Sequence, residues 1–326
     1  MVEKPQSDWE SRHKVWLDFV SKVIETFEAG SALPVGPFAV PVIPPEIRPS
    51  GAPGKKVVLC SPHPDDEALV GALALRLRLE SGARVVNCAI TLGENKAERP
   101  RRLAEVTASC AALGFRLIVL NHPHGLDSVR PNTRSTSPAE WAKKVRALSE
   151  VLDQEKPDIV FLPHAEDFHP AHLGTHHLAL DALAAHLKQL TREPVMLVET
   201  EYWHELPSPN LMIGVSPEVE AALLMAVAEH GGEVARNPYH IRHPARLIDN
   251  VRRGSEVVGG VGAAACTFPF AELYRVSFMA GKNEIAPREG GRIVGPTERI
   301  DPAQLVGDFL PGNWQQAGQR EAREEK

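Results

Sequence analysis

Hydrophobic residues follow two alternating patterns along most of this chain. Short apolar runs that are typical of buried strands occur at 57–60, 84–92, 116–120, 158–162 and 195–203. Apolar residues at three- and four-residue spacing, which indicate helices, occur at 67–80, 100–113, 138–155, 171–190, 217–229 and 240–257. Strands that alternate with helices are typical of βαβ units. We therefore predict an α/β, Rossmann-like fold with a mostly parallel sheet and helices on both faces.

The two ends of the chain differ from this central pattern. Residues 7–29 have apolar side chains at helical spacing, so we predict an N-terminal helical extension. A proline-rich stretch follows and predicts an extended connector. Another strand is expected within 266–280, and glycine and proline are frequent after it. We expect three parts: a helix and connector at 1–54, a central domain at 55–280 and a peripheral tail at 281–326.

Length and charge exclude several classes of protein. The chain has 326 residues, which suits one large domain with additions or two smaller domains. Its net charge of −6 argues against a nucleic-acid partner, because binding to phosphates requires a basic face. No apolar stretch reaches the ~20 residues that a membrane span requires, and the N-terminus lacks the features of a secretory signal. We expect a cytoplasmic protein, and its oligomeric state is open, a homo-oligomer included.

The cysteines carry no recognisable metal or disulfide pattern. Cys60, Cys88, Cys110 and Cys266 are far apart in the sequence and have apolar neighbours. This predicts buried, reduced thiols that pack as small hydrophobic side chains. If the protein holds a metal ion, we expect its ligands to be histidine and carboxylate.

Titratable residues gather directly after the first predicted strand. The segment "VVLCSPHPDDEALV" places His63-Pro64-Asp65-Asp66 where that strand ends and a helix begins. Ligands of doubly wound sheets bind at such carboxyl ends of strands. Acids in a first helical turn also complement the helix dipole, and that explanation would account for the two aspartates alone. The adjacent histidine favours a chemical role.

A second segment repeats this arrangement after the fourth predicted strand. His169-Pro170-Ala171-His172 again lies between a strand and a helix, and five of the 14 histidines fall within 164–177. Such clustering favours a metal or catalytic role over scattered surface positions. If both loops face one crevice, His63, Asp66 and His172 supply two imidazoles and a carboxylate. This donor set suits a catalytic zinc ion with one open coordination position.

The remaining residues of the two segments suit hydrolysis. Asp65 is free to take a proton from a water molecule that the metal activates, since the pKa of zinc-bound water falls to roughly 7. His169 is placed to protonate a leaving nitrogen or to stabilise an oxyanion. We therefore predict metal-assisted hydrolysis of an amide, with one Zn²⁺ per chain or another divalent metal in its place.

"SPHPDDEALVGALAL" together with "DFHPAHLGTHH" resembles the zinc-dependent N-acetylglucosamine deacetylases, the PIG-L or LmbE-like family. The resemblance implies an LmbE-like catalytic domain at 55–280 that removes an acetyl group from an N-acetylated sugar or glycoconjugate. It also implies that His63, Asp66 and His172 are zinc ligands and that Asp65 is the general base. His169 takes the acid or oxyanion position.

One residue departs from the family pattern. The family has aspartate where this chain has Ala171, so a contact that orients a histidine is expected to be lost unless Asp167 or His164 replaces it. Weaker matches suggest substrate contacts by Arg102, Asp127 and Glu272, whereas solvated arginine and turn-forming aspartate are the plainer interpretations of the first two. Tyr202 and Trp203 either pack in the core or stack on a sugar.

Three functions remain open from the sequence. The leading hypothesis is deacylation of an amino sugar or a related amide. A variant is an amidase that acts on thiol-cofactor conjugates, which the same residues could support. A third is a sugar-binding module that retains the metal site without turnover, although a binding site has no need of the unligated Asp65. Phosphoester hydrolysis is disfavoured because there is one predicted metal and no phosphate cradle.

Overall fold

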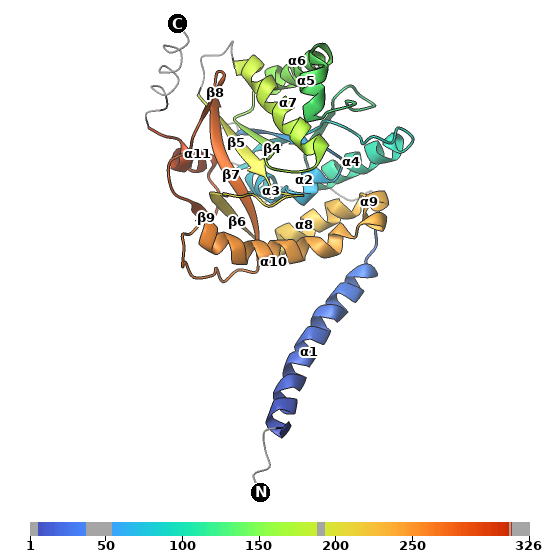
Figure 1. Ribbon diagram of the computed structural model, residues 1–326, viewed down its shortest axis with the longest axis vertical. Helices are drawn as coiled ribbons and strands as arrows, with labels where there is room; N and C mark the ends of the chain where they lie inside the picture. The colour runs from blue at the N-terminus through green and yellow to red at the C-terminus, as the bar shows by residue number, and fades with distance from the viewer. Residues whose placement is uncertain (1–5, 37–53, 188–192, 313, 315–326) are drawn as a thin grey trace.

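A computed structural model describes residues 6–36, 54–187, 193–312 and 314 (Figure 1). Its strands are β1 (Lys56–Ser61), β2 (Arg84–Ala89), β3 (Arg116–Val119), β4 (Ile159–Pro163), β5 (Val195–Thr200), β6 (Leu211–Val215), β7 (Phe270–Ala280), β8 (Asn283–Ile285) and β9 (Arg292–Val294). They form one sheet in the order β3-β2-β1-β4-β5-β7-β6-β9, and β8 pairs with β7. Strand β7 runs antiparallel to β5 and β6, and β8 runs antiparallel to β7, whereas the other pairs are parallel. The predicted mostly parallel sheet is confirmed.

Helices cover both faces of this sheet. The helices of the described chain are α1 (Gln6–Ser31), which extends away from the sheet, and α2 (Asp66–Leu69), α3 (Ala72–Ser81), α4 (Arg99–Leu113), α5 (Pro131–Thr136), α6 (Pro138–Glu155), α7 (Pro170–Leu187), α8 (Pro217–Ala228), α9 (Gly231–Arg236), α10 (Tyr239–Val257) and α11 (Pro302–Phe309). Helices α3, α4 and α8 pack together on one face, and α6 and α7 pack on the other (Figure 1). The predicted α/β class and the N-terminal helix are confirmed.

The sequence of β1 explains why both faces are covered. Successive side chains of a strand point to opposite faces of the sheet. Val57 and Leu59 therefore pack in the cluster that contains Leu73 of α3. Val58 and Cys60 pack in the other cluster, which contains residues of α6 and α7. A strand that is buried on both faces must be apolar at every position, which is why β1 appears in the sequence as an uninterrupted run.

Several elements differ from the sequence-based expectation. The helix expected over 67–80 is divided into α2 and α3 at Val70 and Gly71. Gly71 is required there, because an added Cβ would lie 2.3 Å from the carbonyl oxygen of Glu67. The strand expected over 195–203 ends at Thr200. Strands β6, β8 and β9 and helices α5, α9 and α11 were not predicted. Strands β8 and β9 have three residues each, which are too few to show a hydrophobic period.

Part of the predicted tail packs against the central domain. Strand β9 pairs with β6, and the buried guanidinium of Arg76 donates to the carbonyl oxygens of Gly295 at 3.1 Å and Glu298 at 2.5 Å. The connector predicted before residue 54 lies mostly outside the described residues, which resume at Gly54. The division into three parts stays a prediction.

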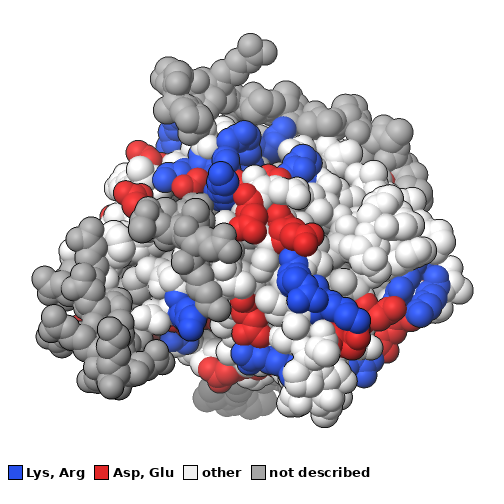
Figure 2. All heavy atoms as spheres, turned by 90° about the horizontal axis from the view of Figure 1, so that it is seen from above, with Lys and Arg blue, Asp and Glu red and all other residues white. Residues whose placement is uncertain are grey.

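Surface charge is mixed on the face that Figure 2 presents. Lys and Arg side chains alternate there with Asp and Glu, and no field of a single sign dominates the described surface in this view. Among the described residues, no helix combines the length and the apolar character that crossing a membrane requires.

The strand order places a crevice above the centre of the sheet. From β1 the chain first adds β2 and β3 on one side, and it then returns to place β4 on the other side of β1. This reversal is the topological switch point at which open α/β sheets bind ligands. The loops that follow β1 and β4 begin at neighbouring strand ends. Residues more than 100 positions apart in the sequence therefore lie close together.

Gly174 of α7 provides a test of the packing beside this crevice. An added Cβ would lie 2.3 Å from the carbonyl oxygen of Val129 and 2.6 Å from the amide nitrogen of Arg130. We expect Gly174→Ala to lower the free energy of unfolding by about 1–3 kcal/mol, as overpacking does. Gly307→Ala in α11 is the matched control, because no atom lies within 4 Å of its added Cβ. Equal stability of the two variants in denaturant titrations would contradict this packing.

Candidate functional site

The loop after β1 positions the first group of polar side chains. His63 follows the strand directly, and its backbone N–H donates to Oδ2 of Asp66 at 2.8 Å, which holds the carboxylate over the loop. Asp65 has a backbone φ of 111°, a conformation that non-glycine residues rarely adopt. Strain of this kind persists only where the surrounding structure enforces it, and it is concentrated at functional sites.

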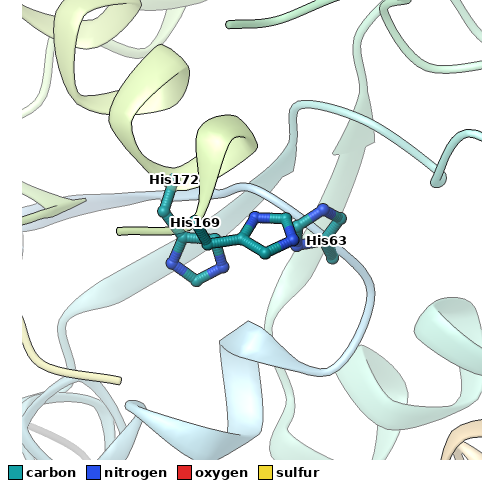
Figure 3. A group of neighbouring side chains, drawn as sticks. All are labelled: His63, His169 and His172. Atoms are coloured by element: carbon teal, nitrogen blue, oxygen red, sulfur yellow. The ribbon is translucent and has the colours of Figure 1, made fainter. Parts of the chain in front are cut away.

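The start of α7 brings two histidines to the same place. His169 immediately precedes Pro170, the first residue of α7, and His172 lies in the first turn. Figure 3 shows both imidazoles facing His63, which reaches them from the loop after β1. The ring centroid of His63 lies 4.9 Å from that of His169 and 5.3 Å from that of His172. The structure therefore brings together the histidines of the two sequence segments.

The Asp66 carboxylate lies between two of these imidazoles. Its Oδ2 atom is 3.7 Å from Nδ1 of His63 and 3.6 Å from Nε2 of His172. Two ligands at ~2.0–2.1 Å from a tetrahedral zinc ion are about 3.4 Å apart. The separations of these donor atoms are therefore close to those around a shared metal ion.

Unpaired polar atoms support the same interpretation. Nε2 of His172 and Nδ1 of His169 are buried and have no hydrogen-bond partner among the described residues. Buried polar atoms almost always have a partner, so such atoms call for an explanation such as an ion. Potential ligand atoms of His63, His169 and His172 also lie within 4.8 Å of one another. Two ligand sets thus fit a divalent cation, one completed by Asp66 and the other by His169.

Asp167 lies where a carboxylate can replace the orienting contact that Ala171 cannot make. Its Oδ2 atom lies 3.3 Å from Nδ1 of His172, and its Oδ1 atom accepts a hydrogen bond of 2.7 Å from the backbone of His169. A carboxylate on the far nitrogen of a histidine directs the other nitrogen toward a metal. His164 does not take this place, because its Nε2 atom contacts the carbonyl oxygen of His204 at 3.0 Å.

The two adjacent aspartates have opposite electrostatic environments. Burial, together with the negative charge of Asp66, raises the pKa of Asp65 well above its usual value. Burial alone would also raise the pKa of Asp66, but the imidazoles of His172 and His63 outweigh it and lower this pKa to about 2. Asp66 is therefore the carboxylate that stays ionised, as a metal ligand must.

The histidines differ as well. Burial lowers the pKa of His63, and burial with the nearby His63 and His172 rings lowers the pKa of His169 to about 4. Burial also opposes the charged form of His172, but the carboxylates of Asp66 and Asp167 raise its pKa overall. His63 and His169 are therefore neutral near pH 7, the form in which imidazole binds metal ions.

His63, Asp65, Asp66 and His169 border a cavity of about 430 Å³. Its described lining is His63, Asp65, Asp66, Gly93, Glu94, Arg102, Arg130, His169, Pro170, Ala171, Tyr202, Trp203, Glu233, Arg236 and Tyr239. A second cavity of about 360 Å³ adjoins it and shares His63, Gly93, Glu94, Arg130 and Ala171 with it. The volume suits a small ligand, such as one or two sugar rings.

Two of the predicted substrate contacts lie in these cavities. Arg102 lines the first, where its Nε atom has no hydrogen-bond partner among the described residues and lies 3.7 Å from Oε1 of Glu233. Asp127 lines the second, and its carboxylate pairs with Arg99 at 2.5 Å and Lys96 at 3.6 Å. Both positions suit substrate contact, which stays a prediction.

Glu272 occupies a different environment. It is buried in β7, where its Oε2 atom accepts hydrogen bonds from the backbone of Ala72 at 3.0 Å and from the Tyr274 hydroxyl. Burial raises the pKa of Glu272. Glu272 is absent from the described lining of both cavities. Its hydrogen bond with Ala72 caps the start of α3. A substrate contact from this position is untested.

Other lining residues were missed or left open by the sequence. The Trp203 ring stacks on His169 with centroids 5.8 Å apart, and Tyr202 stacks on His172 at 6.3 Å. Trp203 is 40% exposed, so it borders the cavity rather than the core. Glu233 and Tyr239 come from α9 and α10, and no motif in the sequence marks them. Only the fold reveals that these helices close the cavity.

The segment that contains both groups of site residues is similar to a known protein family. Residues 58–183 match the family described as "PIG-L: GlcNAc-PI de-N-acetylase". The resemblance to the PIG-L family is confirmed for this segment. The PIG-L segment contains His63, Asp65, Asp66, Asp167, His169 and His172, whereas Glu233 and Tyr239 lie beyond its end. No curated protein matches the chain significantly.

Solved structures share the fold of the PIG-L segment and its surroundings. A conserved protein of Thermus thermophilus is 20% identical, with a TM-score of 0.50, and the match covers 68% of this chain and 93% of that one. The N,N'-diacetylchitobiose deacetylase of Pyrococcus horikoshii is 17% identical, with a TM-score of 0.50, and the match covers 70% of this chain and 84% of that one. At these identities the similarity establishes the fold.

A buried pair connects the PIG-L segment to the region beyond it. Nε2 of His230, which lies between α8 and α9, is 2.8 Å from Oε1 of Glu67, and both side chains are fully buried. The other Glu67 oxygen accepts a hydrogen bond of 3.1 Å from the backbone N–H of Asp65. The pair thus links the strained Asp65 backbone to the helices that close the cavity.

Removal of His230 should therefore be costly. His230→Ala leaves the Glu67 carboxyl buried without this partner, and we expect a loss of about 3–5 kcal/mol in the free energy of unfolding. Lys143→Ala is the control, because it breaks the exposed Lys143–Glu140 pair, which is expected to contribute less than about 1 kcal/mol. Denaturant titration measures both. A loss in His230→Ala as small as that in the control would show that the pair is not buried as described.

Proposed function

We propose that this protein is a metal-dependent amide hydrolase that removes an N-acyl group, in particular acetyl, from an amino sugar or a related amide. The observation that carries the proposal is the convergence of His63, Asp66 and His172 at the edge of a cavity that the separate carboxyl group of Asp65 lines. Binding alone would not require Asp65 at this place. The match of residues 58–183 to the PIG-L family supports an amide hydrolase.

We assign the metal to His63, Asp66 and His172, and we expect it to be zinc. The unpaired Nε2 atom of His172 and the ionised Asp66 support this assignment. When bound, the ion would polarise the acyl carbonyl group and lower the pKa of water. Asp167 would keep His172 in the orientation that presents Nε2.

Asp65 and His169 would transfer protons in this mechanism. Asp65 would accept a proton from the attacking water, and its position in the cavity beside Asp66 supports this role. His169 would donate a proton to the leaving nitrogen or stabilise the developing negative charge on the acyl oxygen. Stacking on Trp203 holds the His169 ring at the cavity wall. The nitrogen would leave as a free primary amine, and the acyl group would leave as a carboxylate.

The cavity favours a small polar amide as substrate. The aromatic face of Trp203 is suited to packing against a sugar ring, and Arg102, Arg130 and Glu233 offer hydrogen bonds to hydroxyl groups. The adjoining cavity that contains Asp127 leaves room for a second group of a glycoconjugate. The Pyrococcus enzyme acts on N,N'-diacetylchitobiose, so acetylated amino sugars are the first candidates. We expect the protein to work in the cytoplasm.

The metal ligands can be separated from the catalytic groups by metal analysis of purified variants. We expect Asp66→Ala and His172→Ala to lose most of the bound metal, because each removes one of three proposed ligands. His169→Ala should retain it, and this variant is the control, since its imidazole lies equally close to the cluster. If His169→Ala loses metal while Asp66→Ala keeps it, the ligand set is the three histidines instead.

Turnover depends on Asp65 in this mechanism. We expect Asp65→Asn to lower kcat about 10²–10⁴-fold, the usual contribution of a general base, while metal content stays at the wild-type level. The assay measures acetate and free primary amine released from a panel of N-acetylated sugars. Metal loss in Asp65→Asn would show that Asp65 is a ligand. A metal-loaded wild-type protein that binds these sugars without releasing acetate would indicate a binding module.

A further inference from the structure

Helix α1 exposes an unusual number of large apolar side chains. Those exposed by 40% or more are Trp9, Val15, Trp16, Leu17, Phe19, Val20, Val23, Ile24 and Phe27. Trp16 is 68% exposed. Scattered apolar residues are normal on a protein surface, but a contiguous group of this size marks an interaction surface.

Only the C-terminal end of α1 touches the rest of the described chain. Gly30 lies against Ile241 of α10, and just beyond the helix Gly36 donates a backbone hydrogen bond of 2.7 Å to Ala228. From there α1 extends away from the central domain, as Figure 1 shows. No other described element packs along its length, so the apolar face has no cover within the described chain.

The spacing of these residues is that of a coiled coil. Steps of four and three residues alternate along the seam Trp9, His13, Trp16, Val20, Val23, Phe27 and Gly30. Leu17, Phe19 and Ile24 flank this seam and widen it. A 3.5-residue repeat over three heptads favours packing against another helix.

A helix with this composition needs such a partner. Most helical stability in proteins comes from the packing of an apolar face rather than from intrinsic helix propensity. Aromatic and β-branched residues, which dominate the seam of α1, have lower intrinsic helix propensity than alanine or leucine. The 26 residues of α1 therefore require contacts that the rest of the described chain does not supply.

The charges of α1 favour a protein partner over a membrane surface. From residue 9 onward its sequence contains the acids Glu10, Asp18, Glu25 and Glu28 and the bases Arg12, Lys14 and Lys22. Helices that lie on membranes are rich in Lys and Arg on the polar face, which attracts anionic lipids. The polar face of α1 carries both signs and lacks a basic residue in its last turn.

The available area suits a dimer. Eight of the exposed apolar residues lie on the seam or beside it, and α1 is about 39 Å long. If each loses on the order of 100 Å² of exposed surface, two paired helices bury roughly 1,600 Å², which is typical of a stable interface. A second copy of the chain always brings an identical apolar stripe, as two-fold symmetric interfaces require.

We propose that α1 is a dimerisation helix whose seam pairs with the α1 helix of a second copy of this chain. The pairing buries Trp16, Val20 and Val23 at its centre. It leaves the cavity residues of each copy untouched, because α1 contributes none of them.

Sedimentation equilibrium of the full-length chain tests this pairing. We expect the wild-type protein to have twice its monomer mass of 35.6 kDa at micromolar concentrations. Val20→Asp should weaken self-association at least tenfold, because it places a charge in the seam of both copies. Ser11→Asp is the matched control, because Ser11 lies on the opposite face of the same helix and the added charge is the same. Thermal unfolding of each variant checks that the central domain remains folded.

Three results would overturn the proposal. The first is a wild-type protein that is monomeric at these concentrations. The second is equal dimerisation of Val20→Asp and Ser11→Asp, which would place the interface elsewhere. The third is binding of monomeric wild-type protein to vesicles of phosphatidylcholine and phosphatidylserine, lost in Val20→Asp, which would assign the seam to lipid. A dimer that only the seam substitution dissociates supports the pairing.

Discussion

The Asp66 carboxylate, held between the imidazoles of His63 and His172, is the interaction on which the site depends. Its Oδ2 atom lies 3.7 Å from Nδ1 of His63, in the loop after β1, and 3.6 Å from Nε2 of His172, in the first turn of α7 after β4. Two buried titratable groups, Asp66 and His172, and a partly buried one, His63, are costly at this distance unless a counter-ion stabilises them. In the proposed mechanism, a metal ion bound by the unpaired Nε2 atom of His172 would supply this stabilisation.

The fold supplies this arrangement through its strand order. Because β4 returns to the side of β1 opposite β2, the His63 and His169 loops leave adjacent strand ends and frame a crevice. Helices α9 and α10 then close the crevice from beyond the PIG-L segment, and the buried Glu67–His230 pair fastens them to the loop that contains Asp65. Site and closing helices are thus parts of one packed unit.

Elements and candidate site residues that form a pattern within one short segment could be predicted from the sequence. The uninterrupted run of β1 predicted a buried strand, and His63-Pro64-Asp65-Asp66 marked the end of it at which the candidate site lies. Contacts between distant segments could not be predicted in the same way. Nothing in the sequence places Glu233 in the cavity, inserts antiparallel β7 between β5 and β6, or chooses Asp167 over His164 as the partner of His172. Each of these depends on how the strands assemble.

The most direct test of the site is a crystal structure of the metal-loaded protein, with anomalous diffraction measured on both sides of the zinc absorption edge. The account predicts one anomalous peak within about 2.0–2.2 Å of His63, Asp66 and His172, with Asp65 near the ion but not bound to it. A peak coordinated by Asp65, or a metal bound away from these two loops, would contradict it.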